Sequence, residues 1–190
     1  MTALNSNSSE PRFNIASVKM CTEALGPYRR MSIWFQGCDL GCPGCCNPEL
    51  QPFEVRHVLT QSELIRIATR ARDEFGIEGV TFIGGEPTLQ KGLESLASAL
   101  RGLGLGIIMF TGKLFSELDG ELIKQLDTVI DGRFETDNRD VSRNLIGSNN
   151  QRIINVTDRY SETTWFTDLR PDYIEIDIDD DEIISSGSTY

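Results

Sequence analysis

The feature that most constrains this chain is a loop with three cysteines, Cys38, Cys42 and Cys45, separated by three and then by two residues. Glycine and proline lie between and beside them, and glycines let the backbone curl so that all three thiols point towards one centre. The spacing therefore predicts a metal-binding loop around which the rest of the fold is arranged.

The number of ligands narrows the choice of metal. A structural zinc ion takes four ligands, usually as two pairs distant in sequence, and this chain has no second Cys or His pair. Cys46 follows Cys45 directly, but successive side chains in an extended loop point to opposite sides, so we do not expect both at one ion. An iron–sulfur cube takes one thiolate per iron, and three thiolates leave one iron open to an exogenous ligand.

The motif Cys38-x-x-x-Cys42-x-x-Cys45 resembles the signature of the radical S-adenosylmethionine (SAM) superfamily. The resemblance implies that these three cysteines are the metal ligands and catalytic residues, that they hold a [4Fe-4S] cluster, and that SAM chelates the open iron. Gly26 to Arg30, Gln36-Gly37 and Asn47-Pro48-Glu49 resemble, more narrowly, the small activating enzymes of glycyl-radical proteins. Residues 147–154 resemble a segment of the activators of anaerobic ribonucleoside-triphosphate reductase.

This chain departs from the superfamily pattern at Cys46. The residue after the third cysteine is usually aromatic, and the resemblance implies that it lies beside the adenine of SAM. Cys46 cannot make that aromatic contact. It is a spare thiol that could be oxidised or exchange as a ligand.

Alternating apolar patterns predict the fold class. Strands are expected over 13–21, at an edge, and over 31–35, 79–83, 107–110 and 128–130; helices are expected after a capping box at Thr60, around 93–100 and over 114–126. Strands that alternate with helices form parallel βαβ units. We therefore expect an α/β, single-domain, partial (open) βα barrel with about five or six parallel strands, as the resemblance also implies.

Three further sites lie at the ends of expected strands, and a fourth lies in a polar loop. Gly84-Gly85-Glu86-Pro87 would be an ordinary turn by itself, but after a three-cysteine loop it resembles the motif that receives the SAM amino group. Thr111 and Asp131 end the next two strands, where they begin turns or face SAM or a cation beside it. Asn149 lies in a polar loop that is either a solvated loop or faces SAM or a partner.

Composition and charge limit the partners and the compartment. A net charge of −11 disfavours binding to nucleic-acid phosphates. No run of about 18 apolar residues is present, so we expect no membrane association. The N-terminus has no secretory pattern, and five cysteines argue for metal or redox chemistry in the cytoplasm.

The expected domain layout has three parts: a flexible leader over 1–11, one core domain over 12–170 and an acidic tail over 171–190. The tail contains seven carboxylates and no Lys or Arg. Such a block is usually a solubilising, partly disordered end. Because Tyr173, Ile174, Ile176 and Ile178 lie among the acids, it could instead be a strand that docks a partner.

The resemblance implies an enzyme that cleaves SAM reductively to a 5′-deoxyadenosyl radical and places a glycyl radical on a partner, such as the large subunit of an anaerobic ribonucleotide reductase. A flavodoxin or similar one-electron donor is then required, because no second cysteine cluster could relay electrons. Two alternatives remain open: a radical SAM enzyme acting on a ribosomal peptide or small molecule, and a non-enzymatic metal-binding module.

Overall fold

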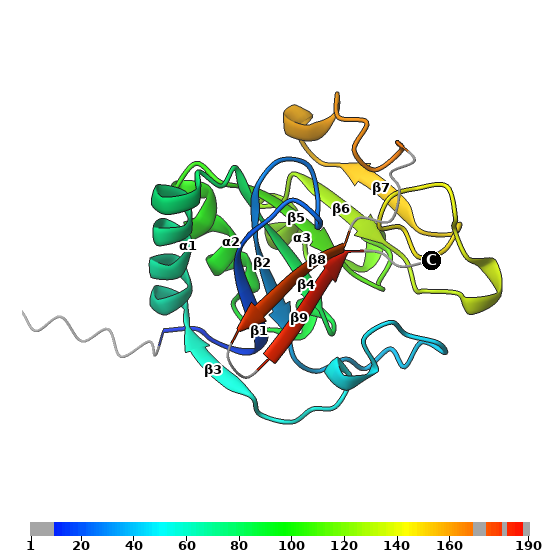
Figure 1. Ribbon diagram of the computed structural model, residues 1–190, viewed down its shortest axis with the longest axis horizontal. Helices are drawn as coiled ribbons and strands as arrows, with labels where there is room; N and C mark the ends of the chain where they lie inside the picture. The colour runs from blue at the N-terminus through cyan, green and yellow to red at the C-terminus, as the bar shows by residue number, and fades with distance from the viewer. Residues whose placement is uncertain (1–9, 169–173, 180–181, 188–190) are drawn as a thin grey trace, which may run out of the picture.

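The computed structural model describes residues 10–168, 174–179 and 182–187 (Figure 1). Seven strands form one sheet in the order β3-β1-β2-β4-β5-β6-β7, and two more form a separate hairpin. The leader expected over 1–11 lies outside the described residues except for Glu10 and Pro11.

The strands are β1 (Arg12–Thr22), β2 (Arg30–Phe35), β3 (His57–Thr60), β4 (Gly79–Gly84), β5 (Gly106–Phe110), β6 (Thr128–Asp131), β7 (Arg152–Asn155), β8 (Ile174–Asp179) and β9 (Glu182–Gly187). The α-helices are α1 (Gln61–Phe75), α2 (Leu93–Gly102) and α3 (Gly120–Ile123). Among the described residues no helix combines the length and apolarity needed to cross a bilayer.

The sheet is mixed. Strands β2, β4, β5 and β6 run parallel to one another, whereas β1, β3 and β7 pair antiparallel. The prediction of five or six parallel strands is therefore wrong, since the segment 23–29 between β1 and β2 is too short for a parallel crossover. The strand predicted over 13–21 is confirmed, but β3 pairs with it on its outer side, so it is not the edge.

Helix α1 forms as its capping box predicts. The Glu63 N–H donates to the Thr60 hydroxyl at 3.2 Å, and the Thr60 N–H donates to the Glu63 carboxylate at 2.8 Å. Gly76 ends the helix with φ of +64°, a left-handed conformation that glycine adopts without strain. The helix thus starts and stops where the sequence predicts.

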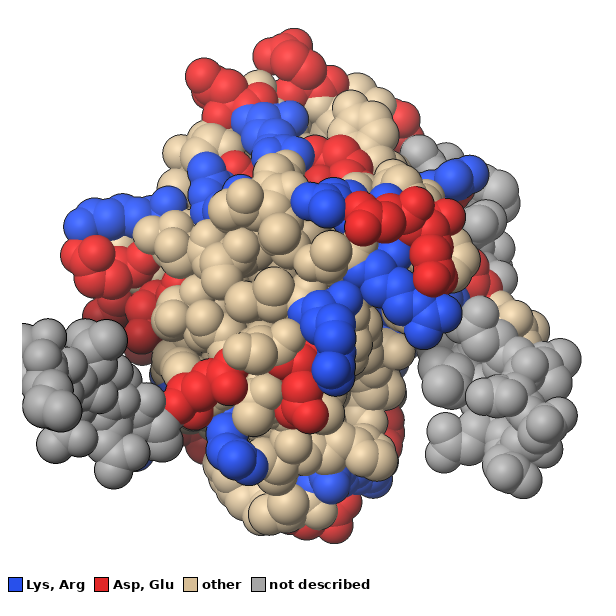
Figure 2. Space-filling model, turned by 90° about the vertical axis from the view of Figure 1, so that its left-hand side faces the viewer, with Lys and Arg blue, Asp and Glu red and all other residues tan. Residues whose placement is uncertain are grey.

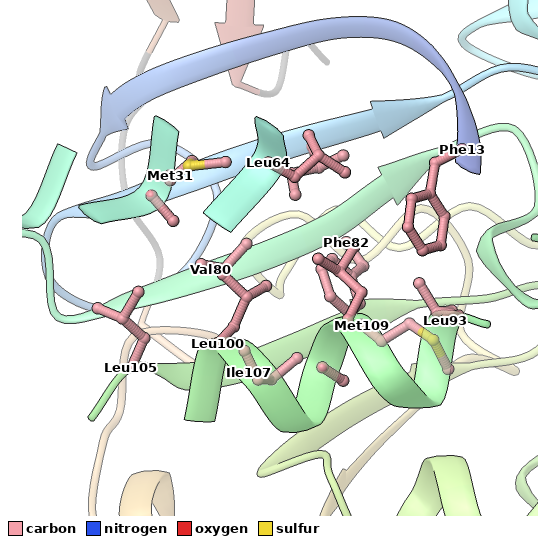
Figure 3. Close-up of a cluster of buried hydrophobic side chains, with 14 of the residues drawn as sticks. Phe13, Met31, Leu64, Val80, Phe82, Leu93, Leu100, Leu105, Ile107 and Met109 are labelled. Atoms are coloured by element: carbon pink, nitrogen blue, oxygen red, sulfur yellow. The ribbon is translucent and has the colours of Figure 1, made fainter. Parts of the chain in front are cut away.

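The helices cover one face of the sheet (Figure 3). Buried side chains of α1 and α2, including Leu64, Leu93 and Leu100, pack on those of β4 and β5, including Phe82 and Met109. Burial of each such side chain contributes about 1.5–3 kcal/mol. This packing holds the parallel strands in register, so their carboxyl ends lie together.

A second cluster lies on the opposite face of β5 and β6. Because side chains alternate along a strand, Ile108 and Ile130 point away from the first cluster. They pack with Ile146, Trp165 and Phe166 from the segments that follow β6 and β7. The chain after β6 therefore contributes to the core although it contains little regular structure.

The helix predicted over 114–126 is wrong in extent. Only a 3-10 turn over Phe115–Glu117 and the four-residue α3 are present. Asp119 adopts an extended conformation and caps α3 through its side chain, which interrupts any continuous helix. Of the side chains predicted to face inward, Leu122 and Leu126 are nevertheless buried and Leu118 is half-buried.

The acidic C-terminal segment contains the β8–β9 hairpin, while Tyr173 lies outside the described residues. The Glu175 carboxylate accepts hydrogen bonds from Lys19 Nζ at 2.6 Å, Thr22 Oγ1 at 2.6 Å and the Glu23 N–H at 2.8 Å. One acid of this segment therefore binds the end of β1. On the face shown in Figure 2, basic and acidic residues are interspersed, so neither sign dominates it.

Candidate metal centre

The carboxyl ends of the four parallel strands bring the expected site segments to one edge of the sheet. Phe35 at the end of β2 pairs with Gly84 of β4, and Phe110 at the end of β5 pairs with Ile130 of β6. The cysteine loop and Thr111 directly follow two of these ends, and the glycine-rich turn and Asp131 begin at the ends of β4 and β6. Ligand sites in open α/β sheets occupy this position.

The cysteine loop, residues 36–51, is anchored at its base. The Gly37 N–H donates to Leu50 O at 2.9 Å, and the Cys38 N–H donates to Gln51 O at 3.0 Å. The Gln36 side-chain amide donates to Pro52 O at 2.8 Å. These bonds close the loop on itself and hold its first cysteine at the end of β2.

The tip of the loop contacts the chain after β6. The Thr136 hydroxyl donates to Pro43 O, and a Cβ added at Gly44 would lie 2.6 Å from Thr136 Oγ1. Gly44 has φ of +70°, so glycine is needed there both for the backbone conformation and for the close approach. The sequence does not show that Gln36 and Thr136 hold this loop, because each bonds to a residue distant in the chain. Gln36 binds Pro52, and Thr136 binds Pro43.

The thiols differ in exposure. Cys38, Cys42 and Cys45 are free and partly buried, whereas Cys46 is exposed. The Cys45 N–H donates to Cys42 O at 3.2 Å, which keeps these two residues in one tight turn. The Cys46 sulfur instead accepts from the Asn47 amide at 3.3 Å. The surroundings of Cys46 thus differ from those of the three motif cysteines.

Three thiols are the donors that an iron–sulfur cube takes, so the chemistry of this set fits one. Among the described residues, no group of three or more His, Cys, Asp and Glu side chains is placed to hold a single metal ion. A cube binds each thiolate at a different corner, so its ligands surround it and need not meet at one point. Burial raises the pKa of the Cys38 thiol, and Glu86 and Cys42 raise it further, so metal binding must displace a held proton.

The glycine-rich turn lies directly on the cysteine loop. The Gly85 N–H donates to Phe35 O at 2.8 Å, and the Glu86 N–H donates to Gly37 O at 2.9 Å. A Cβ added at Gly85 would lie 2.3 Å from Gly37 O, so no larger residue fits. Two segments nearly fifty residues apart thereby form one surface beside Cys38.

The Glu86 carboxylate is buried and accepts four hydrogen bonds. Its Oε1 accepts from the Thr88 N–H, the Thr88 hydroxyl and the Thr111 hydroxyl, the last at 2.8 Å; its Oε2 accepts from the Gly112 N–H at 3.0 Å. The structure therefore brings Glu86 and Thr111 together, with the Thr111 hydroxyl as donor and the Glu86 carboxylate as acceptor. Glu86 ties the turn after β4 to the turn after β5.

Asp131 is buried and pairs with Arg152 of β7, whose Nε lies 2.9 Å from Asp131 Oδ1. It also accepts from the Phe115 N–H at 2.7 Å. Burial alone would raise the pKa of Asp131, but the hydrogen bonds from Arg152 and Phe115 outweigh it and hold the pKa below its ordinary value. Asp131 is thus an ionised carboxylate at the rim of the site.

Asn149 lies in the loop that leads to β7. Its side-chain amide donates to Arg139 O at 3.0 Å and to Asn138 O at 3.2 Å, and the residue is exposed. It lines a hollow of about 550 Å³ together with Gln151, Arg152 and Phe166. Asn149 therefore holds the turn after β6 against the loop that leads to β7.

A family model described as a 4Fe-4S single cluster domain matches residues 24–154. The anaerobic ribonucleoside-triphosphate reductase-activating protein of Enterobacteria phage T4 is 26% identical over 151 residues, which cover 76% of this chain and 96% of that protein. The pyruvate formate-lyase-activating enzyme of Clostridium pasteurianum is 40% identical over 67 residues, 34% of this chain and 28% of that protein. Among solved structures, QueE from Escherichia coli overlaps 63% of this chain and 70% of its own with a TM-score of 0.47 and 14% identity, which is too partial to bear on the fold.

Proposed function

This chain belongs to the family of 4Fe-4S single cluster domain proteins, and from that premise we propose that it is a radical SAM activating enzyme that places a glycyl radical on a partner protein. The partner is a glycyl-radical enzyme resembling the large subunit of anaerobic ribonucleotide reductase. The names of the relatives from phage T4 and C. pasteurianum support this assignment.

The observation that carries the proposal is one surface built from two loops. Three free, partly buried thiols lie on a loop at the end of β2, and the Gly84–Pro87 turn is hydrogen-bonded to that loop at Gly37. In our proposal Cys38, Cys42 and Cys45 hold a [4Fe-4S] cluster, and the Gly84–Pro87 turn, Thr111, Asp131 and Asn149 border the SAM beside it.

The bound cluster would supply the single electron that splits SAM into methionine and a 5′-deoxyadenosyl radical. The residues of the chain provide orientation and exclude water. Glu86 keeps the turns after β4 and β5 together through Thr111 and Gly112, so the floor of the site is fixed before SAM binds. Cys38, Cys42 and Cys45 are partly buried, whereas much of the loop around them is exposed, so bound SAM and the partner's loop would complete the exclusion of water.

The strands β2, β4, β5 and β6 form the parallel part of a partial barrel whose open side admits a loop of the partner. A flavodoxin or similar protein donates the electron in the cytoplasm. The core domain spans 12–170 and the acidic tail spans 171–190.

The test is anaerobic reconstitution with iron and sulfide, followed by dithionite and SAM. We expect 5′-deoxyadenosine by chromatography, and a glycyl doublet by electron paramagnetic resonance when the glycyl-radical subunit of an anaerobic ribonucleotide reductase from the same genome is added. Cys38→Ala, Cys42→Ala and Cys45→Ala should each lose the cluster and the cleavage together. Cys46→Ala is the matched control and should keep both; the reverse result would refute the ligand assignment.

A further inference from the structure

An uninterrupted run of exposed residues lies beside the cysteine loop. All residues over 52–58, here called the exposed strip, are exposed. The strip includes Phe53, Val55 and Val58, with 73%, 77% and 44% of their surfaces accessible. Single exposed apolar side chains are ordinary, but three of the eight large exposed apolar residues of the described chain fall within these seven residues, which makes the strip a candidate interaction surface.

The strip leads into a strand edge that is open for pairing. β3 is the outermost strand of the seven-stranded sheet and pairs only with β1 among the described residues. Edge strands are commonly protected by charged side chains or proline, whereas β3 carries Val58 on its exposed surface. An extended segment of another chain can add to such an edge through backbone hydrogen bonds.

The strip is directly attached to the cysteine loop. A Cβ at Gly37 would lie 3.1 Å from the ring of Phe53, so this ring packs over the residue that precedes Cys38. The Gln36 amide binds Pro52 O, and the Asn14 side chain binds both Glu54 O at 2.7 Å and the Arg56 N–H at 3.0 Å. The strip is therefore held in place before any partner arrives, which lowers the entropy cost of binding.

The charge of the strip indicates the chemistry of its partner. Glu54 and Arg56 form an ion pair at 3.1 Å, so the strip carries no net charge in a chain with a net charge of −11. An apolar segment suits this surface better than a basic or acidic one. The exposed valines and Phe53 would supply apolar contact area for its side chains.

We propose that the exposed strip and the free edge of β3 dock the glycyl-radical protein, which adds an extended apolar segment there. The inference rests on the proposed function, which requires a glycine of the partner to reach SAM at the cysteine loop. The partner must then cover the rim of that loop, and the strip continues this rim through Phe53 and Gly37.

The test compares Phe53→Ser and Val55→Ser with Phe75→Ser, a matched control because Phe75 is also exposed but ends α1. Reconstituted variants are assayed for SAM cleavage without partner, and for affinity and glycyl-radical yield with the subunit activated by the wild-type protein. Val55→Ser should leave SAM cleavage unchanged and weaken partner binding by about tenfold or more, as a central apolar contact does. Phe75→Ser should change neither.

The outcomes separate the two proposals. If the wild-type protein never cleaves SAM, the proposed function fails. If it cleaves SAM and activates the subunit, but Val55→Ser binds that subunit as tightly as the wild type, the docking surface is overturned. The same holds if sedimentation shows that Val55→Ser breaks a homodimer while partner affinity stays unchanged, because the strip would then bind a second copy. Should Phe53→Ser disturb the cysteine loop, Val55→Ser alone decides.

Discussion

The Glu86 carboxylate offers the sharpest test of how the site is built. Replacement by Gln keeps the size of the side chain but exchanges one acceptor oxygen for an NH₂ donor. In one amide orientation this NH₂ faces the Gly112 N–H, and in the other it faces the Thr88 N–H and the hydroxyls of Thr88 and Thr111. Either orientation leaves a backbone N–H without an acceptor.

The expected cost follows from that count. An unsatisfied buried donor costs about 1–3 kcal/mol, so Glu86→Gln should lower the free energy of unfolding by about 2 kcal/mol. For a chain of this length that corresponds to a melting temperature lower by about 4–8 °C. Thermal unfolding of the metal-free protein, followed by circular dichroism under anaerobic conditions, measures it.

Glu94→Gln is the matched control, because Glu94 is exposed on the first turn of α2. It should change the stability by less than about 0.5 kcal/mol. A Glu86→Gln protein that melts like the wild type would refute the role of Glu86 as an internal acceptor. If that protein also bound SAM more weakly, the carboxylate would face the ligand and not the two turns.

Three further changes test other parts of the fold. Burial, with Glu78 adding to it, raises the pKa of Tyr160 from 10.0 to about 12. The contribution of neutral Tyr160 to the free energy of unfolding is therefore fully present below pH 10 and is lost as the pH rises towards 12. Urea unfolding of Tyr160→Phe should show a smaller loss of stability over this range. Arg30→Met should lower the free energy of unfolding by about 3–5 kcal/mol, measured by urea unfolding at pH 7, because the buried guanidinium binds Val80 O at 2.9 Å and Gly106 O at 3.0 Å. Gly85→Ala should bind less iron on reconstitution, measured as iron per chain, because its Cβ would displace the cysteine loop.

Each of these variants has a control in the same chain. Tyr28→Phe alters an exposed tyrosine and Arg29→Met an exposed arginine, so both should leave urea unfolding nearly unchanged. Gly102→Ala adds a Cβ that meets nothing within 4 Å, and it should bind iron like the wild type. Equal results for Gly85→Ala and Gly102→Ala would contradict the contact between the two loops. Equal results for Arg30→Met and Arg29→Met would contradict the buried guanidinium network.

Local patterns allowed most of the helices and strands to be predicted. The capping box at Thr60, the Gly76 terminus and the β-branched strand before Gly84 depend on neighbours in sequence, and the structure confirms them. The prediction of one long helix over 114–126 was wrong, because it rested on apolar spacing alone. Asp119 caps a new helix within this range and thereby interrupts a continuous one. The pairing partner of β1 on its outer side was missed because β3 is short and exposed.

The sequence by itself determined the chemistry: three thiols at fixed spacing on a glycine-rich loop allow few metal centres, because ligand type and spacing belong to one segment. Only the tertiary structure decided what surrounds them. Glu86 binds Thr111, Asp131 binds Arg152, and Phe53 packs on Gly37, and each of these contacts joins a loop to a different part of the chain. Such pairings depend on the register of strands distant in sequence, and register is set by packing of the whole core and not by local pattern.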